Sequence, residues 1–479
     1  MRERGVDAYD FSHDKLREAA YEALSPARRR LLHRRVAGAL EPIHASNPDT
    51  VARRLAVHYE RAGLPQKAVP CYLRAGQAAS RVYANDEAET TFRRGLALLE
   101  GGTRPPSREA WLREMAAGLY EGLGEVLRLG RAAEARMAYR NALGEIDEDD
   151  LLGRARLQRL LGFAWTEPGQ FDRALQAYDA AEALLGTEPV QPFADWWREW
   201  LEVQNRRLYG YYCLGRWRDM AQLLDRMRPT VDRHGMPPHR AFFLSNCTLM
   251  AMRRDRYQIF DETLATAWAA LAAAREWEDP FWLARQQYLL GWALVLRGDL
   301  EEAETHLQAA LALSEQTGFM WVQAVVLSWL TVLYRRRGRV AEVRSYSSRA
   351  LAVGEMVQQL EQVALAQANL AWVAWRAGDL GEAEALGQAA LESWQRSQFV
   401  HSVHWTARWP LLAIALHRGR ISEALDHARE MLDPQQQQLP QSLESALERA
   451  IQAGDEGQPE AVRAHLRRAI DLAQELGYL

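Results

Sequence analysis

The stretch Tyr288–Leu311 reads YLLGWALVLRGDLEEAETHLQAAL, and its pattern decides the fold. Arg297-Gly298-Asp299 divides it into two arms in which apolar residues recur every three or four positions, as they do along one face of a helix. Glycine is the residue that most readily adopts the left-handed conformation at a helix end. The stretch therefore predicts two helices joined by a short turn, that is, a helical hairpin.

Small residues in this hairpin are spaced so that its two helices can cross closely. Ala303, Leu307 and Ala310 place a small, a large and a small side chain on one face of the second helix, and Gly291 supplies a small position in the first. The same spacing recurs in trios that begin at Ala68, Ala88, Ala135, Ala174, Met220, Phe260, Ala303, Val343, Ala383, Ala424 and Val462. Recurrence of one unit along a chain is the signature of a repeat architecture.

Turn residues with a shared position precede most of these trios by five residues. They are Gly63, Gly130, Gly169, Gly215, Gly298, Gly338, Gly378, Gly419 and Gly457, with Asp255 in place of glycine once. A left-handed helix end is tolerated best by glycine, asparagine and aspartate, so we expect Asp255 to adopt positive φ in its turn. From Ala303 onward the trios lie roughly 40 residues apart, which is longer than a standard repeat of about 34 residues.

This order of small and large positions resembles the tetratricopeptide repeat. The resemblance implies an all-α fold, a right-handed superhelix (solenoid) of tetratricopeptide-like helical hairpins with about ten repeats of roughly 40 residues. In such a stack each repeat contacts only its neighbours, so a chain of 479 residues needs no division into separate globular cores.

The N-terminal region resembles something more particular. FSHDKLRE (Phe11–Glu18), AAYEAL (Ala19–Leu24), SPARRRLLHRRVAGALE (Ser25–Glu41) and HYERAG (His58–Gly63) are similar to the junction in bacterial STAND-type regulatory ATPases where a winged-helix element ends and a repeat domain begins. Relatives in that class include regulators like the maltose-regulon activator and the antibiotic regulatory proteins. The resemblance implies a transcriptional regulator with an ATPase domain upstream of this region.

His13 matches a histidine that, in that family, can approach the phosphates of the bound nucleotide. The chain contains no Gly-Lys pair, so it lacks the phosphate loop GxxxxGK[ST] and is not itself the ATPase. We expect His13 to face a nucleotide only if an upstream ATPase domain is present. The alternative is a histidine at a helix start with local hydrogen bonds.

Composition shifts and prolines predict the domain organisation. We expect a helical remnant of the winged-helix junction at 1–41, N-terminal repeats at 42–100, a linker at 101–107, the main superhelix at 108–432, a Pro/Gln connector at 433–440 and a capping hairpin at 441–479. Within the superhelix, the proline-containing stretches Gly186–Asp195 and Arg228–His239 should interrupt the helices, because proline blocks helix continuation.

Charge and cysteine content exclude several classes of function. The formal net charge is −4, so no overall field attracts a polyanion, and direct nucleic-acid binding is not expected. Cys71, Cys213 and Cys247 are isolated thiols that fit a reducing cytoplasm. The longest purely apolar run, Tyr288–Leu296, is too short to cross a membrane. We therefore predict a cytoplasmic protein with no membrane partner.

No catalytic motif is present: the sequence has no GxSxG, HExxH, CxxC or calcium-loop pattern. His401 and His404 are spaced as neighbours on one helix face, but no carboxylate or cysteine accompanies them, so packing roles are favoured over a metal site. We expect no enzyme activity, no cofactor and no metal.

Aromatic residues and arginines give the best candidate binding site. In tetratricopeptide-type stacks the first helix of each hairpin lines the concave face, and registering the helices on the trios places one set of side chains there: Arg285, Tyr288, Trp292, Arg335, Arg336, Trp372, Trp375, Arg376 and Trp409. Aromatic faces and guanidinium groups suit a planar or carbohydrate ligand, an acidic peptide or a neighbouring domain. The alternative is that the tryptophans fill gaps between repeats.

Three candidate functions are compatible with these sequence features. The first is a non-catalytic interaction and ligand-sensing domain, the sensor or scaffold of a STAND-type regulator, whose groove binds a protein, a peptide or a small-molecule inducer. The second is a stand-alone peptide-binding adaptor of the tetratricopeptide class, which would depend more on arginines than on tryptophans. The third, nucleic-acid reading by repeats, is disfavoured by the charge.

Overall fold

A computed structural model of the chain describes residues 2–3, 9–10, 14–100, 109–128, 130–166, 169–187, 191, 193–277 and 279–479. These residues form two compact units, Met1–Leu161 and Gly162–Leu479, a division that the sequence analysis did not predict. The predicted linker at 101–107 and the candidate residue His13 lie outside the described residues.

The first unit is helical apart from one short strand pair. Strands β1 (Arg2–Glu3) and β2 (Tyr9–Asp10) pair antiparallel, with Arg2 opposite Asp10. They are followed by α1 (Asp14–Glu22), α2 (Pro26–Ile43), the 3-10 helix η1 (Pro48–Val51), α3 (Ala52–Arg61), α4 (Pro65–Arg81), α5 (Asn85–Glu100), α6 (Glu109–Leu127) and α7 (Ala132–Glu145). Helix α8 (Leu151–Thr166) continues into the second unit.

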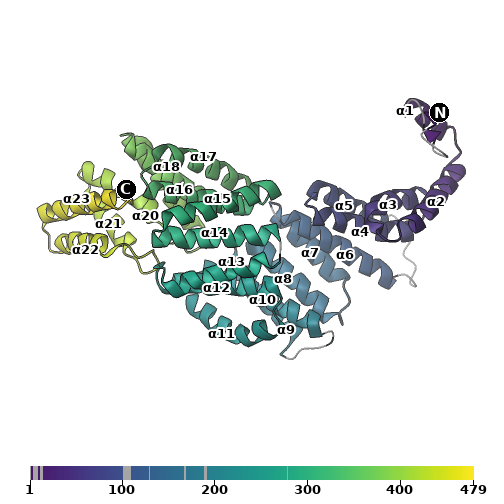
Figure 1. The fold of residues 1–479 in the computed structure, drawn as a ribbon, viewed down its shortest axis with the longest axis horizontal. Helices are drawn as coiled ribbons and strands as arrows, with labels where there is room; N and C mark the ends of the chain where they lie inside the picture. Colours follow the sequence, from purple (N-terminus) through teal and green to yellow (C-terminus); the bar gives the residue numbers. More distant parts are fainter. Residues whose placement is uncertain are drawn as a thin grey trace. The chain divides into compact units, whose positions relative to one another are not determined.

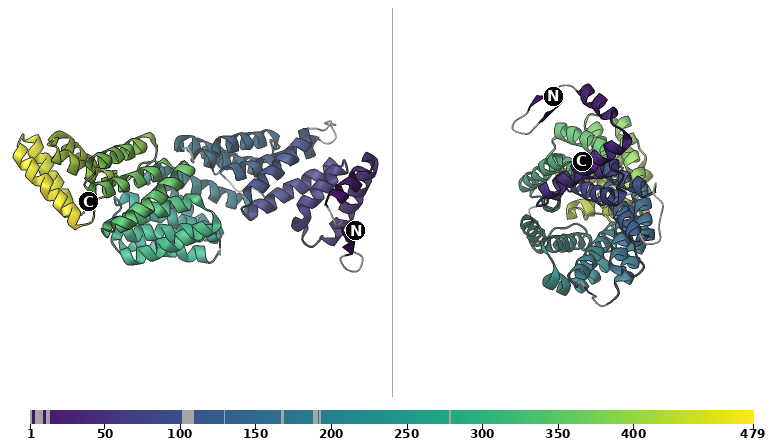
Figure 2. Two further views of the ribbon diagram at one scale, coloured as in Figure 1. Left: turned by 90° about the horizontal axis from the view of Figure 1, so that it is seen from above. Right: turned by 90° about the vertical axis from the view of Figure 1, so that its right-hand side faces the viewer.

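The second unit consists of consecutive helices that lie side by side in chain order (Figures 1 and 2). They are α9 (Phe171–Leu185), α10 (Phe193–Cys213), α11 (Trp217–His234), α12 (Pro237–Arg254), α13 (Asp261–Arg275), α14 (Pro280–Arg297), α15 (Leu300–Thr317), α16 (Met320–Arg336), α17 (Val340–Met356), α18 (Leu360–Arg376), α19 (Leu380–Arg396), α20 (Trp405–His417), α21 (Ile421–Met431), α22 (Gln441–Asp455) and α23 (Pro459–Glu475). The predicted all-α solenoid of helical hairpins is confirmed.

Close helix crossings hold each hairpin together, as the trios predict. In the hairpin α14–α15, Ala303, Leu307 and Ala310 are fully buried, and a Cβ atom added to Gly291 would lie only 2.7 Å from Cγ of Leu307. Only a residue without a side chain fits at that distance, so Gly291 sets how near the helices approach. The trio beginning at Phe260 is wrong in register, because α13 begins at Asp261 and the Phe260 side chain is exposed.

The turns follow the glycine pattern with one exception. All nine predicted turn glycines have positive φ, for example 102° at Gly298, where α14 ends. Asp255 does not: its φ is −95°, and the left-handed residues of that turn are Arg256 and Tyr257. The expectation for Asp255 is therefore wrong, and two bulky residues adopt a conformation that costs free energy unless tertiary contacts hold it.

Proline interrupts the helices less than expected. Helix α11 continues through Pro229 to His234, so the predicted break at Arg228–His239 begins too early and the real break is at Gly235 and Met236. Pro229 is exposed, whereas Met227 and Val231 on either side are buried and hold the helix in place. Tertiary packing thus compensates for the hydrogen bond that proline cannot donate.

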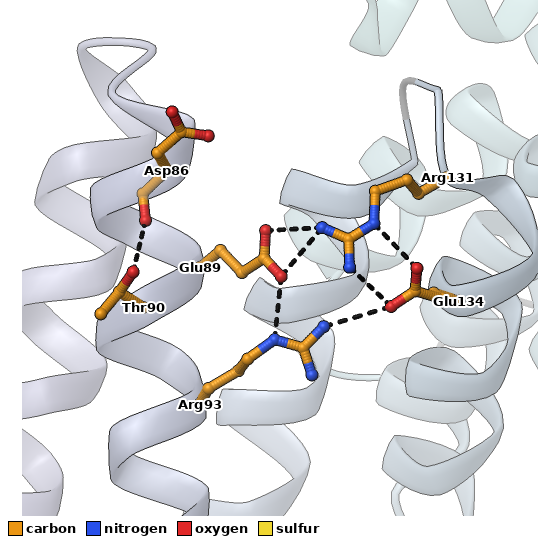
Figure 3. A network of polar contacts seen from close by, with 6 residues as sticks. All are labelled: Asp86, Glu89, Thr90, Arg93, Arg131 and Glu134. Atoms are coloured by element: carbon orange, nitrogen blue, oxygen red, sulfur yellow. Dashed lines mark hydrogen bonds and ion pairs between the residues drawn. The ribbon is translucent and has the colours of Figure 1, made fainter.

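Exposed ion pairs connect successive hairpins of the first unit. Arg131 at the start of α7 contacts Glu89 of α5 at 2.8 Å and Glu134 of its own helix at 2.7 Å, and Arg93 joins the same two carboxylates (Figure 3). Partial burial opposes ionisation of Glu89, but the hydrogen bonds from Arg93 and Arg131 lower its pKa. These contacts lie between nearest neighbours, as a solenoid requires.

The second unit also has contacts between segments far apart in sequence. Its first helices of each hairpin, α10, α12, α14, α16, α18 and α20, pack against one another in series, and we call them the inner helices. Three non-helical segments lie against them, each anchored by a backbone group: Val400 N–H donates to Cys213 C=O at 2.8 Å, Gln438 N–H to Arg256 C=O at 2.8 Å, and the carbonyl of Tyr478 accepts from Arg335 at 2.6 Å. The predicted Pro/Gln connector is therefore a packed segment.

Candidate functional site

Helix α14 carries Arg285 and Tyr288, two predicted site residues that are partly open to solvent. Asp279 caps the helix by accepting hydrogen bonds from the N–H groups of Phe281 and Trp282, and Pro280 occupies the first helical position. This start fixes the register in which Arg285 and Tyr288 lie one helical turn apart, and both side chains are half-buried. The spacing used in the sequence analysis is thus preserved in the structure.

Arg285 is a cation in aromatic surroundings. Its guanidinium lies 4.5 Å from the ring centroid of Phe242 and 5.6 Å from that of Trp282. Among the described residues, no carboxylate lies within ion-pair distance of it. Burial lowers the pKa of Arg285 to about 10, opposed by Tyr209 and favoured by nearby Arg206. A partly desolvated cation without an acidic partner is a good receptor for a carboxylate.

Further along α14, Tyr288 and Trp292 pack on each other and on the next inner helix. The ring of Tyr288 stacks on Trp292 at 5.9 Å, and Trp292, which is buried, lies 5.0 Å from Trp329 of the next inner helix. Burial raises the pKa of Tyr288. Arg285, Tyr288 and Trp292 therefore form one continuous cluster in which only the first two reach solvent.

Arg335 is completely buried, which the sequence analysis did not anticipate. Its guanidinium donates to the carbonyl oxygens of Thr406 at 2.7 Å and Tyr478 at 2.6 Å and to Asn369 at 3.3 Å, and burial lowers its pKa. It lies 5.6 Å from the ring of Trp372, which is also buried. Both side chains are covered by the protein itself and do not form an open surface.

The other predicted site residues differ in burial and in the side chains they contact. Arg336 is half-buried above the ring of Tyr478, Arg376 is exposed beside Trp372, and Trp375 packs against the small core around Ala383. Trp409 is fully buried. The nine predicted residues thus do not form one surface, and their role in ligand binding stays a prediction that Arg285 and Tyr288 carry best.

The sequence pattern did not indicate the residues that surround Arg285. Arg206 of α10 lies 4.3 Å from the ring of Phe163, and Tyr209, one turn further along, is half-buried near Arg285. Phe242 comes from α12. Each belongs to an earlier inner helix, and their sequences repeat no motif of α14, so only the packing of α10, α12 and α14 brings them together.

Arg253 near the end of α12 is a second arginine in an aromatic cage, and the sequence analysis did not single it out. The rings of Tyr212, Tyr257 and Phe399 lie 4.6, 5.5 and 5.6 Å from its guanidinium. It donates a hydrogen bond to the carbonyl of Val400. The spacing of the trios does not reveal this cage, because Ala383 and Ala424 are separated like the other trios although α20 has 13 residues whereas α18 has 17.

His401 and His404 lie in this non-helical segment before α20, so the expectation that they share a helix face is wrong. Their rings stack on Trp394 at 4.8 and 4.7 Å, and burial lowers the pKa of both, that of His404 to about 3. In the described part of the chain, no group of three or more histidine, cysteine, aspartate or glutamate residues is placed to hold a metal ion.

Comparison with known proteins gives a fold and leaves the family open. No protein-family model matches the chain. A segment of 98 residues is 35% identical to an uncharacterized protein of Rhizobium meliloti (strain 1021), and it covers 20% of this chain and 10% of that protein. The chain thus matches about a tenth of the length of this longer relative.

Solved structures that are similar to this chain have low sequence identity to it. A Rap protein complexed with Competence and Sporulation Factor is 15% identical, with a TM-score of 0.50 over 85% of this chain and 98% of that chain. A STAND protein with a tetratricopeptide repeat sensor from Pyrococcus horikoshii is 14% identical, with a TM-score of 0.48 over 92% of this chain and 67% of that chain. None of the described helices combines the length and apolar character that a membrane span requires. The hairpins, their turn glycines and the likeness to the Rap protein identify the fold as an all-α repeat solenoid of the tetratricopeptide type.

Proposed function

We propose that the chain is a non-catalytic repeat domain that binds a protein or peptide partner through the inner helices of its second unit. Arg285 carries this proposal. It lies on an inner helix, it is partly open to solvent, and no described carboxylate neutralises it. An acidic side chain of a partner would supply the missing charge, and Phe242 and Trp282 would hold the guanidinium in place for it.

The wider context of this function is the sensor or scaffold of a STAND-type transcriptional regulator. The resemblance of residues 10–63 to the junction in such ATPases supports it. Binding of a partner or inducer would act by favouring one arrangement of the stack over another, since a ligand shifts an equilibrium only through its preference between states. A stand-alone peptide-binding adaptor is the second candidate, and it would use the same Arg285 site. An intact upstream reading frame that encodes GxxxxGK[ST] would favour the regulator.

Peptide selection against the whole chain tests the proposed site. Peptides displayed on phage and selected on the wild-type chain should be enriched in aspartate and glutamate. For the selected peptides, Arg285→Ala should weaken binding at least about tenfold, because a charge-assisted hydrogen bond is lost. Arg344→Ala is the matched control, since Arg344 is exposed on α17, which is not one of the inner helices, and should leave affinity nearly unchanged. Peptides without acidic residues, or an Arg285→Ala variant with full affinity, would contradict the proposal.

A further inference from the structure

The segment that connects α19 to α20 departs from the pattern of the other hairpins. Residues 397–404, SQFVHSVH, which we call the strap, leave α19 after Arg396 and enter α20 at Trp405. Instead of turning directly between the two helices, the strap reaches α12 and the turn between α10 and α11. Its contacts there lie 147 or more positions away in sequence.

Val400 is bound through both of its backbone groups. Its N–H donates to the carbonyl of Cys213 at 2.8 Å, and its own carbonyl accepts from Arg253. The Val400 side chain lies against Gly215, where an added Cβ would be 3.4 Å from the nearest valine methyl carbon. The site therefore satisfies one backbone donor and one backbone acceptor of Val400, the kind of main-chain pairing by which proteins bind peptides at sheet edges.

The two residues before Val400 are held through their side chains. The ring of Phe399 lies edge-on to Tyr212 at 5.9 Å and 5.6 Å from the guanidinium of Arg253. The side-chain oxygen of Gln398 accepts from the N–H of Phe171 at 2.9 Å. Residues 398–400 thus have an amide, an aromatic and a β-branched side chain, each with a partner on α9 to α12.

The second half of the strap is bound by residues of the segment between α21 and α22. Gln436 donates to the carbonyl of His401 at 2.9 Å and accepts from the N–H of His404 at 3.1 Å. The N–H of Gln437 donates to the carbonyl of Ser402 at 2.8 Å. These contacts would persist if residues 398–400 left their site, so the strap has an anchored half and an exchangeable half.

We propose that the place where residues 398–400 lie is a peptide-binding site and that the strap occupies it as a built-in competitor. The site consists of the N–H of Phe171, the carbonyl of Cys213, Gly215 and the cage of Arg253 with Tyr212 and Tyr257. Its ligands are extended peptides with an amide, an aromatic and a β-branched residue in succession. This inference rests on the proposed function, because it names a second peptide contact and its regulation on the same inner helices.

Tethering makes the strap a strong competitor. A segment joined by a short flexible connection has an effective concentration on the order of 1 mM at its own site. If strap and free peptide have the same intrinsic Kd on the order of 10 µM, the strap raises the apparent Kd of the free peptide roughly a hundredfold. Removing the strap's side chains should therefore expose binding that the wild-type chain conceals.

A labelled peptide in trans tests the proposal. Fluorescein-labelled RSQFVHSVH, which copies residues 396–404, is titrated with the full chain and followed by fluorescence anisotropy. The strap variant F399A/V400A should bind it at least tenfold more tightly than the wild-type chain. Adding R253Q to this variant should abolish the gain, because the cage loses its cation. The peptide RSQAAHSVH is the matched control and should bind neither chain.

Hydrogen exchange shows whether the strap has left its site. In F399A/V400A the amide of residue 400 should exchange faster, whereas the helices α14 to α19 should keep their wild-type rates. Equal peptide affinity of the wild-type chain and the strap variant would overturn the proposal, as would a released strap with no peptide binding or a strap variant whose residue 400 stays protected. None of these results would affect the Arg285→Ala experiment, which examines the proposed function separately.

Discussion

The two compact units use arginine side chains differently. In the first unit, Arg131 and Arg93 pair with carboxylates at the surface and connect helices that are neighbours in the stack. In the second unit, Arg253 and Arg335 are buried, have no carboxylate at ion-pair distance among the described residues, and donate to backbone carbonyls of distant segments. The second unit also has surface pairs between neighbouring hairpins, such as Arg349 with Glu315, but its buried arginines join segments that are far apart in sequence.

This difference bears on stability. An exposed ion pair gains little, because water screens both charges and two long side chains lose rotamer freedom. A buried donor that satisfies otherwise unpaired carbonyls matters more, because removing it leaves acceptors without partners in a place that water does not reach. We therefore expect the second unit to depend on single arginines and the first unit to tolerate their loss.

The largest expected effect is that of Arg335→Ala. The carbonyls of Thr406 and Tyr478 lose their donor and a cavity opens beside Trp372, so the free energy of unfolding of the second unit should fall by on the order of 3 kcal/mol. Urea unfolding followed by tryptophan emission measures this, because every tryptophan except Trp111 lies in the second unit. Arg376→Ala is the control. A smaller change for Arg335→Ala than for Arg376→Ala would show that burial does not decide the effect.

A fall in pH should destabilise the second unit through its buried histidines. Burial, and then Arg408, lower the pKa of His427 to about 4, from a usual value of about 6.5 in the unfolded chain. Between these values the unfolded chain binds a proton that the folded chain does not, so stability is lost as the pH falls below about 6.5. From pH 7 to pH 5 the loss should be about 2 kcal/mol for such a residue.

His427→Gln sharpens this prediction. Glutamine does not titrate, and its side-chain oxygen can accept the hydrogen bond that Arg408 directs at Nδ1 of His427 at 3.2 Å. The urea midpoint of tryptophan emission should therefore depend less steeply on pH in this variant than in the wild-type chain. The same pH dependence in both chains would mean that His427 is not a source of the loss. His33, buried beside His58 in the first unit, has a lowered pKa too and should contribute in the same direction there.

The smallest expected effect is that of Arg131→Ala in the first unit. Its contacts with Glu89 and Glu134 are exposed, so the melting temperature should change by about 2 °C at most, and the change should disappear in 1 M salt. Circular dichroism follows the melting of the whole chain, and hydrogen exchange of the α5 and α7 amides shows whether the change belongs to this unit. A large change that persists in high salt would show that the network in Figure 3 contributes more than surface pairs do.

The fold could be predicted because its determinants are local. The turn at Gly298 and the crossing of Gly291 with Leu307 depend on residues a few positions apart, and both occur as the pattern indicates. Where the prediction failed, tertiary contacts outweighed local preference. Pro229 remains helical between buried neighbours, and Arg256 and Tyr257 adopt positive φ in a turn where Asp255 was expected to do so.

The candidate site could be predicted only in part. Arg285 and Tyr288 share a face because they share a helix, which periodicity can show. The burial of Arg335 depends on Tyr478, and the cage of Arg253 depends on Phe399, and in both cases the partner is more than a hundred residues away. Helical spacing contains no information on such contacts, because it describes one element at a time.

The strap also determines how the second unit should respond to a pulling force. Hairpins that contact only their neighbours separate one after another under tension, so a solenoid of this kind lengthens gradually at low force. The contacts of Val400 with Cys213 and Arg253 bridge all the hairpins between them, so tension is carried past those hairpins until the bridge breaks. The second unit should then resist extension until this bridge breaks and extend easily beyond that point.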